Sequence, residues 1–204
     1  RPAVPIVIVV TLALAIGAGT AVFSLLDAVV LNPVAVARPA ELVTLGEGSG
    51  GHGFSYPMSK LLRARNTTTE GIAGHVSTSV AVRAGDHAEQ LGASVVTGNY
   101  FEVLGLRPQH GRLLQDADEA APGATPYAVL SDALWRRVYG ADPAVVGQTV
   151  SINEAPFTIV GIAPPRFRGT TLASPVDVWV PMTMMGTIGR SGLWALPDVL
   201  DTWF

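Results

Sequence analysis

The first thirty residues form the longest hydrophobic stretch of the chain. The run from Val4 to Leu31 contains a single charged residue, Asp27. A membrane-spanning helix needs about 20 apolar residues, and in lipid a lone segment satisfies its backbone polar groups only as a helix. The pattern therefore predicts a transmembrane helix over residues 1–33, ended by Asn32-Pro33.

Two other interpretations of this segment stay open. A buried core helix would be unusually long. A cleaved signal peptide would use Arg1 as the end of its basic region and Gly19-Thr20-Ala21 as a small-residue cleavage site. We favour a retained helix, because apolar character continues past that site to Leu31. Arg1 before the helix and Asp27 after it then favour a cytoplasmic N-terminus with the following domain outside.

One face of this helix carries small residues. Ala13, Gly17 and Ala21 lie four residues apart, and Ala28 falls near the same side. Such spacing lets a second helix approach closely, although Ala and Gly are also simply common in membrane helices. If the face is functional, its partner helices belong to another part of the protein or to another chain.

Downstream, period-2 and period-3.6 patterns alternate in mixed order. Strands are expected at 41–45, 73–83, 89–97, 127–130, 148–152, 157–162 and 176–180, and helices at 56–65, 98–105 and 133–139, with a helical turn at 142–143. Residues 182–204 look loop-like. This order predicts an α+β domain over 38–204, in which helices pack on a mixed or mostly antiparallel sheet.

Polar residues at the expected helix starts indicate specific caps. Ser55 and Ser131 each precede a predicted helix and can accept a hydrogen bond from its first turn. Leu61 and Leu62 are expected on the inner face of the helix at 56–65. Gly140 is expected to end the helix at 133–139.

Composition and charge exclude several function classes. Hydrophobic residues make up 49% of the chain and charged residues 14%, compared with about 25% charged in average soluble proteins. The net charge of −3 argues against a nucleic-acid partner, which would require a basic face. Cysteine is absent, so disulfides, thiol chemistry and Cys-based metal sites are excluded.

A glycine-rich loop offers a nucleotide-binding alternative. Gly46 to Gly51 matches G-x-G-x-x-G between a predicted strand and a predicted helix, and Glu70 lies near the spacing of a ribose-binding acid. The frame from Gly48 to Gly53 matches equally well, which shows how permissive the pattern is in this loop. No parallel βαβ series follows, and no P-loop motif occurs anywhere, so we do not expect ATP hydrolysis by this chain.

The remaining chemistry-bearing residues form no recognisable site. The four histidines, His52, His75, His87 and His110, lack metal-ligand spacing. The acidic residues between Asp116 and Glu119 lack the glycine and distal glutamate of a calcium loop, so a solvated acidic loop is expected. No G-x-S-x-G motif supports a catalytic triad. We expect no catalytic residue, no cofactor and no metal, and therefore no enzyme.

Five segments together resemble the MacB-like periplasmic core domain of ABC-transporter permeases in the FtsX-related class. They are Thr20–Leu31, similar to the end of that family's first transmembrane helix; Phe54–Pro57, similar to its first periplasmic helix; Val96–Leu106, the most specific segment; Leu130–Trp135; and Val160–Pro164. The resemblance spans about residues 11–181. It implies structural roles for Gly98, Asn99, Tyr100, Phe101, Gly105, Ser131, Trp135, Gly161 and Pro164.

Elementary geometry gives these motif residues specific tasks. Asn99 can cap the short helix, Gly98 permits the turn before it, and Gly105 can close it with a positive φ. Trp135 and Tyr139 lie one helical turn apart and should face the core. None of these residues is chemically reactive.

The resemblance implies a permease fragment in a bacterial cell (inner) membrane, with one visible span and an extracytoplasmic domain. That domain would couple movement of membrane helices to export or to an external partner. The implied partners are the lipid bilayer, further transmembrane helices of the same or another permease chain, and a separate ATPase subunit if the system is ATP-driven. Such domains usually continue further, so truncation at the C-terminus is expected. The alternatives are a secreted or membrane-anchored binding module and, third, a nucleotide-binding domain that uses Gly46–Gly53.

Overall fold

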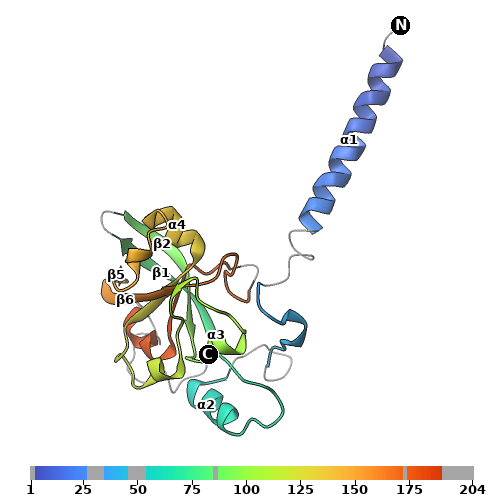
Figure 1. The fold of residues 1–204 in the computed structure, drawn as a ribbon. Helices are drawn as coiled ribbons and strands as arrows, with labels where there is room; N and C mark the ends of the chain where they lie inside the picture. Colours follow the sequence, from blue (N-terminus) through green and yellow to red (C-terminus); the bar gives the residue numbers. More distant parts are fainter. Residues whose placement is uncertain (1–2, 27–34, 46–53, 85–86, 172–173, 190–204) are drawn as a thin grey trace. The chain divides into compact units, whose positions relative to one another are not determined.

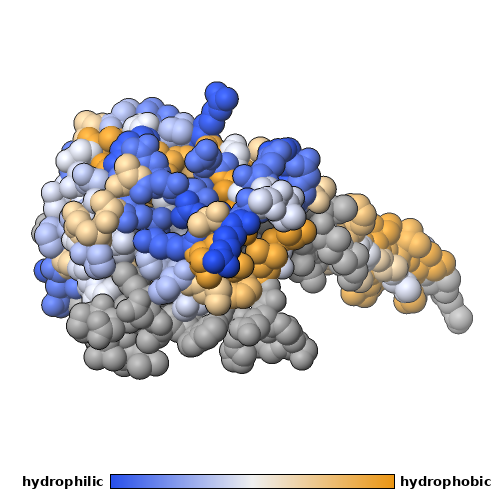
Figure 2. Space-filling view, turned by 90° about the horizontal axis from the view of Figure 1, so that it is seen from below, coloured by the Kyte–Doolittle hydropathy of each residue, from blue (hydrophilic) through white to orange (hydrophobic). Residues whose placement is uncertain are grey.

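The computed structural model describes residues 3–26, 35–45, 54–84, 87–171 and 174–189. The chain divides into two compact units, Arg1–Val34 and Ala35–Phe204. The first unit contains helix α1 (Ala3–Leu26, 24 residues). Its large apolar side chains from Ile6 to Ile16 are all more than half exposed, and its surface is hydrophobic along its length (Figure 2). Among the described residues, no helix qualifies as long and apolar enough to cross a membrane.

The second unit is built on one seven-stranded sheet (Figure 1). Its strands are β1 (His75–Ala84), β2 (His87–Val96), β3 (His110–Gly111), β4 (Tyr127–Leu130), β5 (Thr149–Ile152), β6 (Ala155–Ile162) and β7 (Val178–Pro181). The order is β3-β6-β4-β7-β2-β1-β5, and β5 also pairs with β6. The sheet therefore closes on itself through six strands, with β3 added along β6.

Both parallel and antiparallel pairs occur in this ring. Strands β1 and β2 form a long antiparallel hairpin, and β5 and β6 form a second one around Asn153 and Glu154, which both have positive φ. Strand β4 runs parallel to β6, and β2 runs parallel to β7. The predicted mixed sheet and both predicted hairpins are confirmed. The closure was not predicted, because nothing local in β5 indicates that it also pairs with β1.

The core lies inside the closed sheet. Alternate residues of each strand point inward, as in Val80 and Val82 of β1 and Phe157 and Ile159 of β6, which are all at most 5% exposed. Helix α4 (Asp132–Tyr139) adds Leu134 to this core. The segment after β7 closes it with η6 (Met182–Met184) and α5 (Met185–Ile188), in which all three methionines and Ile188 are buried.

A second cluster packs on the outer face of β7. Trp179 points away from the inner core, and its ring contacts Phe101 and Phe167 at centroid distances of 5.8 and 5.3 Å. Phe101 belongs to the short helix α3 (Tyr100–Val103). Burying three aromatic side chains contributes strongly to stability, so this cluster fixes α3 to the sheet.

Two segments differ from their prediction. Residues 42–45 form no strand, and Leu42, Val43 and Leu45 are exposed rather than paired. They follow a 3-10 turn, η2 (Pro39–Glu41). The segment after β7 was expected to be loop-like, yet η6 and α5 are helical. Methionine-rich segments give little periodic signal, because methionine adapts to irregular gaps.

The two predicted serine caps are present. Ser55 accepts a hydrogen bond from the backbone N–H of Met58 at the start of α2 (Tyr56–Ala64). Ser131 accepts one from Leu134 at the start of α4, and Gly140 ends α4 with φ +59°. Asp142 caps the turn η5 (Pro143–Val145). The expected inner face of α2 is wrong for Leu61, which is 45% exposed, whereas Leu62 is half-buried.

Candidate functional site

The chain enters the domain through residues 35–41, called the junction segment below. Its backbone is attached to α3, because the N–H of Ala37 donates to the carbonyl oxygen of Leu104 at 3.3 Å. Gly105 follows with φ +65°, and a Cβ built on it would lie 2.7 Å from the Cβ of Ala37. Glycine is therefore required at this position for two reasons, the left-handed backbone and the close approach.

A charge pair fixes the same segment to a second element. The guanidinium of Arg38 donates to both carboxylate oxygens of Glu70, and one nitrogen also lies 2.9 Å from Glu41. The hydrogen bond and charge of Arg38 lower the pKa of Glu70 below its ordinary value. Glu70 and Arg38 are exposed, so this pair orients the junction segment more than it stabilises the fold. A forked, two-point contact is well suited to that task.

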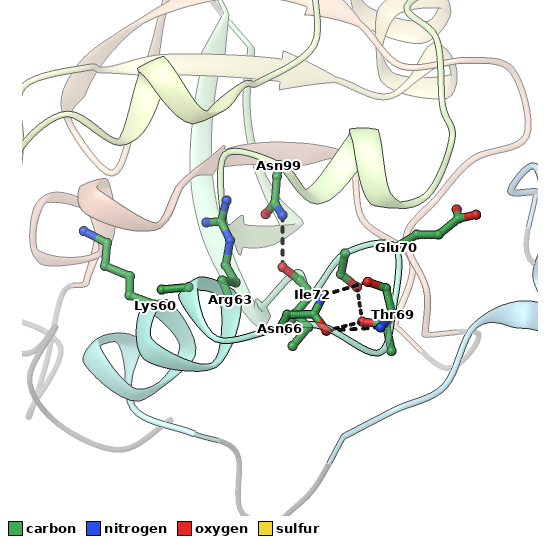
Figure 3. A pocket seen from close by; sticks show the side chains of 9 residues that line it. Lys60, Arg63, Asn66, Thr69, Glu70, Ile72 and Asn99 are labelled. Carbon is green, nitrogen blue, oxygen red and sulfur yellow. Dashed lines mark hydrogen bonds between the residues drawn. The ribbon is translucent and has the colours of Figure 1, made fainter.

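Glu70 also lies on the rim of a surface pocket of about 550 Å³, the α2 pocket (Figure 3). Its charged and polar walls come from α2, from the loop 66–72 and from Asn99. In Figure 3, Lys60 and Arg63 project from α2, while Glu70 points away from them. The α2 pocket is therefore lined by α2 and by the residue before α3, and its rim residue Glu70 binds the junction segment.

Most polar groups of the α2 pocket already have partners inside the protein. Asn66 Oδ1 accepts hydrogen bonds from the backbone of Thr68 and Thr69. Asn99 Nδ2 donates to the carbonyl of Ile72 at 3.0 Å (Figure 3). Among the described lining residues, Lys60 is the cation without an ion pair; its Nζ lies 4.6 Å from the centre of the Tyr56 ring. The pocket offers hydrogen bonds and one free positive charge, but its described residues form no nucleophile–base pair.

Behind the pocket lies a partly buried charge network. Arg63 donates to Glu119 at 3.3 Å and to Asp116 at 2.7 Å, and the hydroxyl of Tyr56 donates to Glu119 at 3.0 Å. Burial, followed by the charge of Glu119, raises the pKa of Tyr56 well above its ordinary value. These contacts clamp α2 onto η4 (Asp116–Glu119).

Two of the three acidic residues of this loop are buried, which corrects the expectation of a solvated loop, whereas Asp116 is exposed. Glu119 is 9% exposed and Asp118 is 3% exposed. Asp118 forms a two-point pair with Arg112, at 2.6 and 2.9 Å. Buried acids of this kind need charged partners. Arg63, the partner of Glu119, is distant in sequence, so no local signal could have revealed the network.

The motif around α3 is a packing device. A Cβ on Gly98 would lie 2.5 Å from the backbone oxygen of Gln115, so only glycine fits there. Asn99 stands at the N-cap position, but its side chain does not cap the helix, which corrects the expectation. Instead, it accepts from Thr97 at 2.9 Å and donates to Ile72. It thereby links β2 to the loop that leads into β1.

The other motif residues also have structural contacts. Ser131 is buried and donates to Asp177 at 2.8 Å, besides capping α4. Trp135 is 3% exposed and its Nε1 donates to the carbonyl of Asp142. A Cβ on Gly161 would clash with the carbonyl oxygen of Arg112. Tyr100 and Phe101 are buried and Pro164 is half-buried.

The small-residue face of α1 lies partly within the described residues. Ala13, Gly17 and Ala21 are exposed, and a Cβ on Gly17 would meet nothing within 4 Å. Ala28 lies outside the described residues. The functional role of this face stays a prediction.

A comparison with protein families identifies the chain. The model of the MacB-like periplasmic core domain matches residues 6–198, almost the whole length. The chain belongs to the MacB-like periplasmic core domain family. The motif around α3 and the Ser131 cap carried the resemblance to this family in the sequence, and both lie within the matched residues.

Curated relatives of this MacB-like domain are macrolide export ATP-binding/permease proteins. The chain is 25% identical over 138 residues to MacB of Shewanella oneidensis, covering 65% of this chain and 21% of the relative. It is 28% identical over 135 residues to MacB 1/2 of Paracoccus denitrificans, covering 64% and 20%. The chain thus spans about a fifth of the length of these relatives.

Two solved structures share the fold of the MacB-like domain. The periplasmic region of MacB from Actinobacillus actinomycetemcomitans matches with a TM-score of 0.57 at 21% identity, covering 72% of this chain and 67% of that one. The extracellular domain of the noncanonic ABC-type transporter YknZ from Gram-positive bacteria matches with a TM-score of 0.54 at 16% identity, covering 66% of each chain. At these identities, the TM-scores establish a likeness of fold alone.

The alternative sites considered from the sequence gain no support. Among the described residues, no group of three or more His, Asp or Glu side chains could hold a metal ion. The loop Gly46–Gly53 lies outside the described residues. The strand expected before it is absent at 42–45, so the strand–loop–helix context of a dinucleotide site is missing there.

The junction contacts were missed at the sequence level. Arg38 is the first basic residue after the hydrophobic run, which is a signal for a membrane-proximal position. Its partner Glu70 lies 32 residues further on. Only the tertiary structure pairs the two.

Proposed function

We propose that this MacB-like domain is the extracytoplasmic part of an ABC-type transporter permease in a bacterial cell (inner) membrane. In that role it couples movement of transmembrane helices to export or to an external partner. Family membership carries the proposal, since the curated relatives are themselves ATP-binding/permease proteins. An ATPase, as a further domain or as a separate subunit, supplies the energy, since the curated relatives are ATP-binding/permease proteins.

The hydrophobic N-terminal sequence anchors the domain in the bilayer. Helix α1 exposes apolar side chains along its described length, and the sequence carries no charge from Pro2 to Leu26. Water-exposed apolar surface on this scale is unfavourable, whereas a bilayer would cover it. Further transmembrane helices of the same or another permease chain would pack against Ala13, Gly17 and Ala21.

The junction segment transmits the movement. A helix that shifts in the membrane moves the domain only if the intervening residues are fixed to it. Ala37 is bonded to α3, and Arg38 is paired with Glu70 on the loop that borders the α2 pocket. The coupling therefore passes from residues 35–38 to α3 and to the loop that follows α2. It requires shape and attachment rather than a catalytic group, and we infer that the chain is not an enzyme.

Spin-label mobility in the membrane-embedded chain tests this coupling. A nitroxide on Ala35→Cys should be as immobile as a reference label on Thr149→Cys in β5. A flexible Gly-Ser segment inserted between Val34 and Ala35 should leave the mobility of the reference label unchanged. A label placed before the insertion should then move more freely than the domain does. The Arg38→Glu variant should loosen the junction, and the exchange Arg38→Glu with Glu70→Arg should restore it. A freely mobile label at Ala35 in the unmodified chain would falsify the coupling.

Mass spectrometry of the mature N-terminus tests the anchor separately. An intact N-terminal segment supports the permease. Cleavage after Ala21 would instead support a secreted binding module, for which the α2 pocket with its unpaired Lys60 would be the first surface to examine.

A further inference from the structure

The large apolar side chains that the domain exposes are concentrated in one part of the chain. Among the described residues of the second unit, they are Leu42, Val43, Leu45, Met58 and Leu61. No described Leu, Ile, Val, Met or Phe from residue 75 to residue 189 is exposed. Single exposed apolar residues are ordinary, whereas a concentration of them indicates a contact with another molecule or with lipid. This concentration follows directly after the junction segment.

Helix α2 carries part of this apolar surface as a continuous stripe. Met58, Leu61 and Ala64 are exposed and lie three residues apart, and the exposed Pro57 lies four residues before Leu61, so all four share one face. They are called the exposed stripe below. The helix is held in this orientation by the buried Tyr56, whose hydroxyl donates to η4. The exposed stripe is therefore turned outward by a fixed contact on the other side of the helix.

Positive charge flanks the exposed stripe. Lys60 lies one helical turn before Ala64, and Arg65 lies one turn after Leu61. Both cations are exposed, and neither forms an ion pair with a described residue. Helix α2 contains no acidic residue, although the whole chain has a net charge of −3. Hydrophobic and strongly hydrophilic side chains also lie side by side on the domain surface in Figure 2. An apolar face bordered by cations is typical of helices that bind anionic membrane surfaces.

The junction segment keeps α2 near the membrane when the hydrophobic run is embedded. Only four residues lead from Leu31, where that run ends, to Ala35, the first described residue of the domain, and such a stretch of chain reaches at most about 14 Å. Ala37 is bonded to α3, and Arg38 is bonded to Glu70 on the rim of the α2 pocket. Helix α2 lines the same pocket. It therefore belongs to the part of the domain that lies next to the bilayer.

Two other segments of the chain fit the exposed stripe less well than a bilayer does. Residues 46–53, directly before α2, consist of glycine, serine, histidine and glutamate and have no apolar side chain to place on it. The last described helix ends at Ile188, whose carbonyl oxygen accepts from Asn153 beside Ala81 of β1. The α2 pocket adjoins the other end of β1 through Ile72, about 20 Å further along the strand. The residues after Ile188 therefore begin far from the stripe.

We propose that the exposed stripe of α2 docks on the surface of an anionic bilayer. Its apolar side chains lie at the boundary between headgroups and acyl chains, and Lys60 and Arg65 contact lipid phosphates. The inference rests on the membrane anchor of the proposed function. It adds a second contact with the bilayer, one that depends on lipid charge and that fixes how the domain stands on the membrane.

Fluorescence quenching in nanodiscs tests the docking of the membrane-embedded chain. The chain has no cysteine, so a fluorophore on Leu61→Cys is the single label. Lipids brominated near the headgroup should quench it strongly in nanodiscs that contain phosphatidylglycerol, and weakly in phosphatidylcholine alone. The matched control is Thr149→Cys, an exposed residue of β5, which should stay unquenched in both. Equal quenching at the two positions, or quenching at Leu61 that ignores lipid charge, would overturn the proposal.

A third label separates the docking from the anchor. A fluorophore on Ala13→Cys in α1 reports on the hydrophobic segment and should be quenched by bromolipid in both kinds of nanodisc. Quenching at Ala13 without quenching at Leu61 would refute the docking and leave the anchor standing, whereas no quenching at either position would remove both. A Leu61 label that is shielded from aqueous iodide but insensitive to bromolipid would show that protein covers the stripe, and would also refute the docking.

Removal of the two flanking cations tests the role of charge. Each cation near an anionic surface strengthens attachment about fivefold, so Lys60→Gln with Arg65→Gln should lower the ratio of docked to undocked domains about 30-fold. Higher salt should act in the same direction. The matched control is Arg83→Gln with Arg166→Gln, two exposed arginines elsewhere in the domain, which should leave the quenching at Leu61 unchanged. Circular dichroism checks that both double variants are folded. Undiminished quenching in the α2 variant would contradict the proposal.

Discussion

Helices α2 and α4 begin alike but differ in what they turn toward the domain. Each is capped by a serine, each is amphipathic, and the two lie in separate parts of the domain (Figure 1). Helix α4 buries Leu134 and Trp135 and exposes its arginines. Helix α2 turns Arg63 toward the domain, to Glu119, and exposes Met58 and Leu61.

The difference shows what an amphipathic pattern can and cannot decide. The pattern defines two faces of a helix, but the surroundings decide which face is inside. Around α4 the available surface is the apolar interior of the sheet. Around α2 it is the buried carboxylate of Glu119. Leaving this charge without a positive partner and a hydrogen-bond donor would cost more free energy than leaving Leu61 exposed. Changes to the two helices test this contrast, from the largest expected effect to the smallest.

Trp135→Ala in α4 should cost the most stability, about 3–5 kcal/mol, as expected for an aromatic residue lost from a core. The change also leaves the carbonyl of Asp142 without its donor. Urea unfolding of the chain in detergent measures the loss. Arg136→Ala on the exposed side of α4 is the control and should change little, since its pair with Asp132 is at the surface.

Glu119→Ala should be the most damaging single change for α2. It leaves Arg63 and the Tyr56 hydroxyl without their buried partner, and breaking such a pair typically costs about 3 kcal/mol or more when both ions are buried. Since the Arg63 side chain is 20% exposed, we expect about 2 kcal/mol. Asp116→Ala removes the exposed partner of the same arginine and should cost under about 0.5 kcal/mol. Equal losses from both variants in urea unfolding would contradict the burial argument.

Loss of the serine cap should also destabilise the protein more at α4 than at α2. Ser131→Ala removes a fully buried hydroxyl that caps α4 and also donates to Asp177, so a loss of about 2 kcal/mol is expected, the upper end for caps. Ser55→Ala removes a longer cap bond of 3.4 Å and should cost about 1 kcal/mol or less. Thermal unfolding of both variants ranks them, and the reverse order would refute the greater dependence of α4 on its cap.

Tyr56→Phe should alter the alkaline limb of the stability curve. Because the folded-state pKa of Tyr56 is raised, the folded chain holds this proton more tightly than the unfolded chain. Stability from this group is therefore complete below about pH 10 and falls as the pH rises above it. The Phe variant should lose about 1 kcal/mol at neutral pH with the bond to Glu119, but decline less steeply above about pH 10. Urea unfolding across this pH range measures both effects, with Tyr139→Phe on α4, where burial alone raises the pKa, as the comparison.

Leu61→Gln should have the smallest effect, within about 0.5 kcal/mol, because the side chain is exposed and substitutions at such sites are usually near neutral. The same substitution at Leu134, which is 2% exposed, should cost far more than at Leu61, because it places an amide in the apolar core. A large loss at Leu61 in the unfolding assay would mean that this face of α2 is covered, and would remove the contrast between the two helices.

Local signals in the sequence were sufficient for much of the fold. The serine caps, the positive φ of Gly105 and Gly140, and the two hairpins depend on residues close together in the chain, so their chemistry is visible there. The strand expected at 41–45 failed because an apolar run forms a strand only if another strand pairs with it. The junction and the network behind the α2 pocket were missed for a similar reason. Arg38 with Glu70 and Arg63 with Glu119 are 32 and 56 residues apart.

The sequence by itself determined the hydrophobic N-terminal segment, the mixed order of strands and helices, and the family to which the domain belongs. Those properties follow from composition, periodicity and short motifs. Only the tertiary structure decided that β5 closes the sheet, that Asp118 and Glu119 of η4 are buried, and that α2 directs Arg63 to Glu119. Each of these depends on contacts between distant segments, in which burial and charge pairing outweigh the local preference of either segment.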